Sequence, residues 1–170
     1  PHKVSSELMP KLMKHAKKYD VEFFSTPVGK KSTQILKDID VNTIKIASGE
    51  ITNHEMIKII AKMKKPMIVS TGMTTISEIT NVVEIIRKEN CPFILLHCNA
   101  SYPTPIEDAN LNTIPYLSKI FDVPIGYSDH TPDMLNPVAA TSIGAKIYEK
   151  HFTIDRSLPG PDHRMSLDPE

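Results

Sequence analysis

The sequence predicts an α/β fold of the (β/α)8 TIM-barrel type, with about six of the eight β/α units present in this chain. Three observations support this prediction. Short runs are almost entirely apolar, amphipathic segments lie between them at intervals of roughly 20–30 residues, and a polar residue follows nearly every run. Continuous apolar strands are typical of parallel sheets that are covered on both faces.

The apolar runs are interpreted as strands and the amphipathic segments as helices. The predicted strands are residues 22–25, 43–47, 66–70, 93–97, 124–127 and 146–149. The predicted helices are residues 5–18, 32–36, 53–61, 75–88, 111–120 and 135–143, with Ser32 and Asn53 as candidate caps. Residues 152–170 are predicted to be irregular.

The alternation of strands and helices fits either an open doubly wound sheet or a barrel. No strand is followed by Gly-x-Gly-x-x-Gly, which removes the main support for a dinucleotide-binding fold. Polar residues at the carboxyl ends of consecutive strands favour a barrel, whose active site lies there. These residues are Thr26, Ser48, Ser70, His97, Ser128 and His151.

Six strands would leave two open edges in a barrel that normally has eight strands. We therefore expect residues 1–170 to form a partial catalytic domain that corresponds to strands 3 to 8 of a barrel, with the first two units missing. No second domain is expected within this chain.

Composition and charge exclude several classes of partner. The 20 basic and 20 acidic residues cancel, so we expect neither a nucleic acid nor a membrane surface as a partner. No apolar run approaches the ~20 residues that span a bilayer. Cys91 and Cys98 lie at the two ends of one predicted strand, roughly 23 Å apart at ~3.3 Å per residue, which is too far for a disulfide. Two unpaired cysteines favour a cytoplasmic location.

His130 and His151 each follow a predicted strand, one strand after the other along the chain. If these strands are parallel neighbours, both imidazoles reach the same rim of the sheet, where they could bind one divalent metal ion. Two histidines with water in the remaining positions suit Mn²⁺, Zn²⁺ or Fe²⁺. Asp129 and Glu149 are adjacent and could orient the ligands. The alternative is that each histidine only makes structural hydrogen bonds.

Lys45 lies inside an apolar strand, either as an inward-facing ammonium for an anion or as a lysine that snorkels to solvent. Ser48, Ser70 and Ser128 end their strands and would add short hydroxyl donors. Such a cluster suits a phosphate group. Glu50 lies in the tight loop after the strand at residues 43–47. There it could contact a sugar hydroxyl, transfer a proton, or only favour a helix N-terminus.

Two proline-rich loops hold further candidates. Tyr102 belongs to a stiff Tyr-Pro-Thr-Pro loop and could press its ring on a substrate or only pack. Asp162 belongs to the stretch Pro159-Gly-Pro-Asp-His163, which exposes a carboxylate whose role the spacing leaves undetermined.

Together these motifs resemble the sialic acid synthase (N-acetylneuraminate synthase) family. The similarity runs from about Phe23 to the end of the chain. The motifs that support it are Lys45-Ile-Ala-Ser-Gly-Glu50, Ser70-Thr-Gly-Met73, His97-Cys98, Tyr102-Pro-Thr-Pro105, Gly126-Tyr-Ser-Asp-His-Thr131, Glu149-Lys-His-Phe152 and Pro159-Gly-Pro-Asp162. One contact is not carried over, because Ala100 stands where some members have Asn.

The resemblance implies a transferase that condenses phosphoenolpyruvate with an N-acetylated hexosamine, typically N-acetylmannosamine. The products are a nine-carbon 2-keto sugar acid and phosphate, and the cofactor is a divalent metal, Mn²⁺ or Mg²⁺. By the same resemblance, His130 and His151 match the metal ligands, and these two residues and Glu50 match catalytic positions. Residues that match phosphoenolpyruvate contacts are Lys45, Ser48, Ser70 and Ser128, with Thr26 beside them, and those that match positions near the sugar are Glu50, Tyr102 and Asp162.

The resemblance also implies a homodimeric parent protein with a C-terminal antifreeze-like domain that closes the partner's site. We expect that domain to be absent from residues 1–170 and the isolated piece to be inactive or nearly so. Three alternatives stay open: a legionaminate, pseudaminate or spore-coat polysaccharide synthase of the same family; a seven- or eight-carbon keto-acid synthase; and a non-catalytic module that binds a sugar phosphate.

Overall fold

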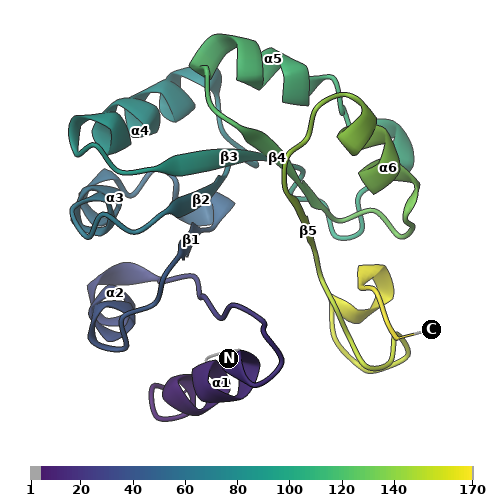
Figure 1. Ribbon diagram of the computed structural model, residues 1–170. Helices are drawn as coiled ribbons and strands as arrows, with labels where there is room; N and C mark the ends of the chain where they lie inside the picture. The colour runs from purple at the N-terminus through teal and green to yellow at the C-terminus, as the bar shows by residue number, and fades with distance from the viewer. Residues whose placement is uncertain (1–4, 170) are drawn as a thin grey trace.

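The computed structural model describes residues 5–169, in which five parallel strands form one curled sheet with the order β1-β2-β3-β4-β5. The strands are β1 (Ile44–Ile46), β2 (Met67–Ser70), β3 (Phe93–Cys98), β4 (Ile125–Asp129) and β5 (Tyr148–Lys150). Each strand pairs with the next one along the chain. Figure 1 shows the helices along the outside of this arc, so the fold is an α/β half-barrel with an open concave side.

Six α-helices accompany the strands within the described residues. They are α1 (Met9–Lys17), α2 (Gly29–Asp38), α3 (His54–Ala61), α4 (Ile76–Lys88), α5 (Thr113–Phe121) and α6 (Leu135–Ser142). Thr75 and Glu78 form a capping box at α4, and the predicted cap Asn53 accepts a hydrogen bond from the Met56 N–H at 3.3 Å. Helix α2 begins at Gly29, three residues before the predicted cap Ser32, whose hydroxyl instead accepts the Val28 N–H at 2.7 Å.

The prediction of a sixth strand at residues 22–25 is wrong. Only one rung forms there, an isolated parallel bridge between Ser25 and Ile44. This segment lies at the edge of the sheet and has β1 alone as a neighbour, so Val21 and Phe24 stay largely exposed. A strand that pairs on one side and packs poorly gains too little to extend further.

The apolar core lies between the outer face of the sheet and the helices. The side chains of Ile44 and Ile46 are fully buried there, whereas Lys45 between them turns to the concave side. Gly126 lets β4 approach its neighbours, because a Cβ at this position would lie 2.5 Å from Leu96 Cδ2 and 2.6 Å from the Ile147 carbonyl oxygen. The close packing of β3, β4 and β5 therefore requires glycine at this position.

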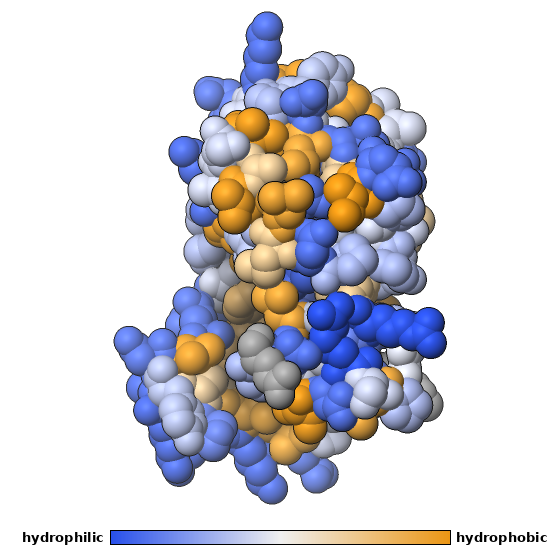
Figure 2. All heavy atoms as spheres, turned by 90° about the vertical axis from the view of Figure 1, so that its right-hand side faces the viewer, coloured by the Kyte–Doolittle hydropathy of each residue, from blue (hydrophilic) through white to orange (hydrophobic). Residues whose placement is uncertain are grey.

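The β5 edge of the sheet is open and apolar. Strand β5 pairs with β4 on one side only. Around it, Leu135 and Val138 of α6 and Phe152 and Ile154 after β5 are each at least 66% exposed. Figure 2 faces this side of the molecule and shows apolar side chains gathered on it. An open edge of this kind was expected of a partial barrel.

Among residues 5–169, no helix has the length and apolar character that crossing a bilayer requires.

Candidate functional site

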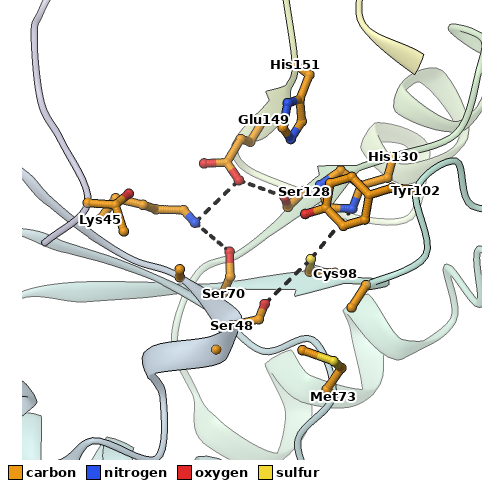
Figure 3. A pocket seen from close by; sticks show the side chains of 14 residues that line it. Lys45, Ser48, Ser70, Met73, Cys98, Tyr102, Ser128, His130, Glu149 and His151 are labelled. Atoms are coloured by element: carbon orange, nitrogen blue, oxygen red, sulfur yellow. Dashed lines mark hydrogen bonds and ion pairs between the residues drawn. The ribbon is translucent and has the colours of Figure 1, made fainter. Parts of the chain in front are cut away.

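A cavity of about 470 Å³ lies on the concave side of the sheet, at the carboxyl ends of the strands. It brings together eight of the ten predicted site residues: Thr26, Lys45, Ser48, Ser70, Tyr102, Ser128, His130 and His151. The other lining residues are Ala47, Gly49, Met73, Cys98, Ala100 and Glu149. Figure 3 shows these side chains converging from different strands and loops. The ring of polar strand ends therefore encloses one space.

Lys45 points into the cavity and does not snorkel to solvent. The residue is only 8% exposed, and its Nζ donates a hydrogen bond to Ser70 Oγ at 2.7 Å. Nζ also lies 3.4 Å from Glu149 Oε1, and Ser128 donates its hydroxyl to the same oxygen at 2.6 Å (Figure 3). A buried ammonium needs such a partner, because an isolated charge out of water is costly. Lys45 and Glu149 thus compensate each other across the concave face.

Ser48 forms part of the cavity wall together with Gly72 and Cys98. Its oxygen accepts the Gly72 N–H at 3.0 Å and donates to Cys98 Sγ at 3.7 Å. A Cβ at Gly72 would lie 2.8 Å from Ser48 Oγ, so this contact needs a glycine. Cys98 and Cys91 are both free, as predicted, and both are buried. Burial raises the pKa of the Cys98 thiol more than the Ser48 hydrogen bond lowers it.

The two histidines lie side by side at the ends of neighbouring strands. The ring centroids of His130 and His151 are 5.3 Å apart, with the planes at 61°. The Tyr102 ring stacks on His130 at 4.0 Å and meets the edge of His151 at 5.7 Å. The predicted convergence of the two imidazoles at one rim is confirmed.

His130 uses one of its two ring nitrogens, Nδ1, in a hydrogen bond to the backbone. Its Nδ1 lies 2.6 Å from the Asn99 carbonyl oxygen. Since a carbonyl only accepts hydrogen bonds, Nδ1 carries the proton and Nε2 carries the lone pair. Burial lowers the pKa of His130, more than the bond to Asn99 raises it, so the ring is neutral at pH 7. A neutral ring with a fixed tautomer is the form that ligates metals.

The two imidazoles could provide nitrogen ligands to a divalent cation, with other ligands completing its coordination shell. Within residues 5–169, no group of three or more His, Cys, Asp or Glu side chains is arranged to hold a metal ion. A cation between His130 and His151 would therefore take its remaining ligands from water or from a substrate. Nitrogen ligands with open positions are typical of catalytic rather than structural metal sites.

Two predicted site residues, Glu50 and Asp162, do not line the cavity. Glu50 ends the turn Ser48–Glu50 and accepts a hydrogen bond from Asn53 Nδ2 at 3.1 Å, toward the start of α3. Asp162 is half-exposed, and its Oδ2 lies 3.8 Å from His151 Nδ1. Glu50 therefore lies beside a helix N-terminus, which was the alternative to a site role. Asp162 lies at the rim of the cavity, next to His151.

The two acidic residues beside the histidines, Glu149 and Asp129, make hydrogen bonds to groups other than an imidazole. Glu149 contacts Lys45 and Ser128 instead of an imidazole. Asp129 points to the opposite face of the sheet, because successive strand residues alternate in direction. Burial raises the pKa of Asp129, but hydrogen bonds from Lys150 and other donors outweigh it and lower the pKa overall. Glu149 was not predicted as a cavity residue. The alternation of strand residues could have predicted it, because Glu149 points to the same face of the sheet as His151.

A curled parallel sheet with a polar cavity at the carboxyl ends of its strands defines an α/β protein of the barrel class, whose functional sites lie at that end. Fold alone does not give function, because this class hosts many chemistries. The closely related proteins narrow the choice.

The model of the NeuB family matches residues 2–170. The protein MJ1065 of Methanocaldococcus jannaschii is 46% identical over 168 residues, which are 98% of this chain and 50% of that protein. The N,N'-diacetyllegionaminic acid synthase of Campylobacter jejuni is 41% identical, over 94% of this chain and 48% of the synthase. The crystal structure of the N-acetylneuraminic acid (sialic acid) synthetase of Leptospira borgpetersenii, in complex with citrate, superimposes with a TM-score of 0.95 at 39% identity, over 98% of this chain and 59% of that one.

The chain belongs to the NeuB family. The resemblance to sialic acid synthases that the motifs predicted is thereby confirmed. The chain spans about half the length of the curated relatives it matches. Those with a named reaction are sugar-acid synthases for different products, among them legionaminic acid, pseudaminic acid and N-acetylneuraminate 9-phosphate.

Proposed function

We propose that this chain forms the phosphoenolpyruvate- and metal-binding half of a NeuB-type synthase. The whole enzyme condenses phosphoenolpyruvate with an N-acetylated hexosamine, N-acetylmannosamine or a relative, to a nine-carbon 2-keto sugar acid and phosphate. The observation that supports this most is a buried ammonium with three hydroxyl-bearing neighbours, placed in one cavity with two converging imidazoles. His130 and His151 would hold the metal, Mn²⁺ or Mg²⁺.

The anion binds at the Lys45 end of the cavity. Lys45 Nζ and the hydroxyls of Ser70 and Ser128 can donate to its carboxylate or phosphate oxygens, since all three already meet at one place. Thr26 and Ser48 line the same end. Glu149 holds Lys45 and Ser128 before the anion arrives, and both donors must turn from Glu149 to the ligand. The related Leptospira synthetase forms a complex with citrate, a small polycarboxylate, so a protein of this family accepts an anion of this kind.

The reaction needs the anion and the sugar aldehyde to meet next to the imidazoles. C3 of phosphoenolpyruvate forms a bond to the aldehyde carbon, water adds at C2, and the C–O bond to phosphate breaks. A divalent cation, when bound, polarises the aldehyde oxygen. The hydrogen bond from His130 to Asn99 keeps the ring in the tautomer that leaves Nε2 available. Tyr102 covers His130 by stacking and limits access of water from that side.

The sugar extends from the cavity over its rim. Tyr102 is 46% exposed there, and Asp162 lies beside His151 on the same rim. Glu50 follows the cavity residues Ser48 and Gly49 at the next position along the chain. We propose these three side chains as sugar contacts. The choice among hexosamines stays open, because the related synthases differ in their sugar acids.

Calorimetry tests this function on the 170-residue chain. Phosphoenolpyruvate and Mn²⁺ are each titrated into wild type, His130→Ala and the control His54→Ala, whose histidine is exposed on α3. We expect wild type and the control to bind both ligands, and His130→Ala to lose Mn²⁺ by about 100-fold while it keeps phosphoenolpyruvate. Unchanged Mn²⁺ binding in His130→Ala would eliminate the metal role. Phosphoenolpyruvate binding without any Mn²⁺ binding in wild type would support a non-catalytic binding module instead.

A further inference from the structure

The face of β4 and β5 that points away from the cavity holds a closed polar network around Asp129. The Asp129 side chain is 0% exposed and that of Lys150 is 4% exposed, and Lys150 Nζ lies 2.9 Å from Asp129 Oδ2. These two residues are register partners on the last rung between the strands. The next residues along the chain are His130 and His151. A buried ion pair therefore stands directly behind the two imidazoles.

Every acceptor position of the Asp129 carboxylate is used. Oδ2 accepts the Tyr148 hydroxyl at 2.7 Å as well as Lys150 Nζ. Oδ1 accepts the Thr131 N–H and the Thr131 hydroxyl, both at 2.8 Å, and the Tyr127 hydroxyl at 3.2 Å. Lys150 donates a further hydrogen bond to the Thr131 carbonyl. The residues before and after His130 are thus tied to each other and to β5.

Stability alone does not explain a network of this kind. A buried ion pair is often no more stable than apolar side chains of the same size, because both charges lose their water. On the outer face of β1, the corresponding positions are filled by apolar side chains, because Ile44 and Ile46 are fully buried there. The network also fixes the local backbone. Asp129 accepts the N–H of Thr131, and this bond holds the turn that contains His130. Lys150 links that turn to the strand of His151.

We propose that Asp129 and Lys150 are positioning residues, which lock the last rung of β4 and β5 so that His130 and His151 face one another. This inference rests on the proposed function of the two histidines. Neither residue lines the cavity, so neither is expected to touch a substrate. The ion pair of Lys65 and Asp40, also at 2.9 Å but with the Asp40 carboxylate 81% exposed, provides a comparison without such a role.

The test uses the double variant Asp129→Asn/Lys150→Met, which removes both charges and leaves no lone buried charge. Its metal-free readout is the Nδ1–H signal of His130 in ¹⁵N-labelled protein, which reports the bond to Asn99. We expect this signal to broaden or vanish in the folded double variant, and its Mn²⁺ affinity to fall at least tenfold. The controls are Asp40→Asn/Lys65→Met and the core variant Val83→Ala, which lowers the melting temperature without touching the rung.

Two outcomes would overturn the inference. One is a folded double variant that keeps the His130 signal and the wild-type Mn²⁺ affinity. The other is a loss of signal in Val83→Ala equal to that in the double variant, because stability alone would then explain it. If wild type binds no Mn²⁺, the proposed function fails, and the metal-free signal still decides the positioning role.

A milder variant keeps the test decisive if the double variant does not fold. Tyr148→Phe removes one hydrogen bond to Asp129 Oδ2 and keeps both charges and the ring. We expect it to fold, to broaden the His130 signal, and to weaken Mn²⁺ binding two- to threefold. A signal and an affinity identical to wild type in Tyr148→Phe would contradict the inference.

Discussion

The two ends of the cavity are held together by different forces. At the Lys45 end, hydrogen bonds and an ion pair join side chains of β1, β2, β4 and β5: Lys45, Ser70, Ser128 and Glu149. At the imidazole end, aromatic contacts dominate, with Tyr102 stacked on His130 and edge-on to His151. The first end is charged and already compensated, whereas aromatic rings form most of the second.

This difference indicates what each end can accept. An anion at the Lys45 end must replace Glu149 as the partner of an ammonium, so binding there is an exchange of partners. A cation at the imidazole end would meet imidazole nitrogens and bring its own charge into the site. The two ends should therefore respond separately to substitutions.

Lys45→Met should separate the two ends most clearly. The substitution removes the ammonium but keeps the length of the side chain, so phosphoenolpyruvate affinity should fall by about 100-fold, as for a lost charge-assisted contact. Mn²⁺ affinity should stay within threefold of wild type. Calorimetry measures both, with Lys65→Met on the surface as the matched control. Equal losses of the two ligands would show that the ends are not separate.

Gly126→Ala should damage both ends together. The new Cβ would lie 2.5 Å from Leu96 Cδ2 and 2.6 Å from the Ile147 carbonyl oxygen, so β5 must move away from β4. Strain of this kind costs about 1–3 kcal/mol of stability. We expect a lower melting temperature and roughly tenfold weaker binding of both ligands, because β4 and β5 contribute to each end.

Gly49→Ala is the control for stability alone, since no atom lies within 4 Å of its added Cβ. Its melting temperature should match that of wild type. A Gly126→Ala protein that melts like wild type would show that the strands tolerate the methyl group, and would contradict the close packing of β3, β4 and β5.

Tyr102 tests the imidazole end. Tyr102→Phe keeps the ring that stacks on His130, so Mn²⁺ affinity should stay within twofold of wild type. Tyr102→Ala removes the stacking and should weaken Mn²⁺ binding about tenfold, since an aromatic pair contributes ~0.5–1.5 kcal/mol. Phosphoenolpyruvate binding should change little in either variant. If Phe and Ala weaken Mn²⁺ binding equally, the hydroxyl and not the stacking matters.

Glu149→Gln should have the smallest effect and the opposite sign. The carboxylate repels an incoming anion and competes with it for Lys45. Its neutral isostere should tighten phosphoenolpyruvate binding roughly fivefold, a modest effect because the side chain is 35% exposed and partly screened by water. Calorimetry at low and high salt measures the change. Weaker binding in Glu149→Gln would indicate that Glu149 mainly orients Lys45 and Ser128.

The sequence predicted the fold class because apolar strands and amphipathic helices show their own periodicities. Five of the predicted strands form the sheet, and two histidines after neighbouring strands meet because parallel strands end at one edge. The strand at residues 22–25 was predicted wrongly. The composition of this segment fits a strand, but the segment lies at the edge of the sheet, where only Ser25 pairs with β1.

The remaining features depend on contacts between distant residues. The ion pair of Lys45 with Glu149 joins the first and last strands of the sheet, and no local pattern encodes it. Tyr102 lies on His130 because of the path of a loop, which composition alone does not determine. Asp129 was considered as a partner that could orient the metal ligands, but the alternation of strand residues turns it to the face opposite His130, and it does not line the cavity.

The most direct measurement counts the imidazoles bound to Mn²⁺ by electron spin-echo envelope modulation on the ¹⁵N-labelled chain. A cation held between neighbouring strand ends predicts two histidine nitrogens in wild type, and one in each of His130→Ala and His151→Ala. Wild-type protein that binds Mn²⁺ with no coupled histidine nitrogen, or substitutions that leave the count unchanged, would contradict a metal site at these two residues.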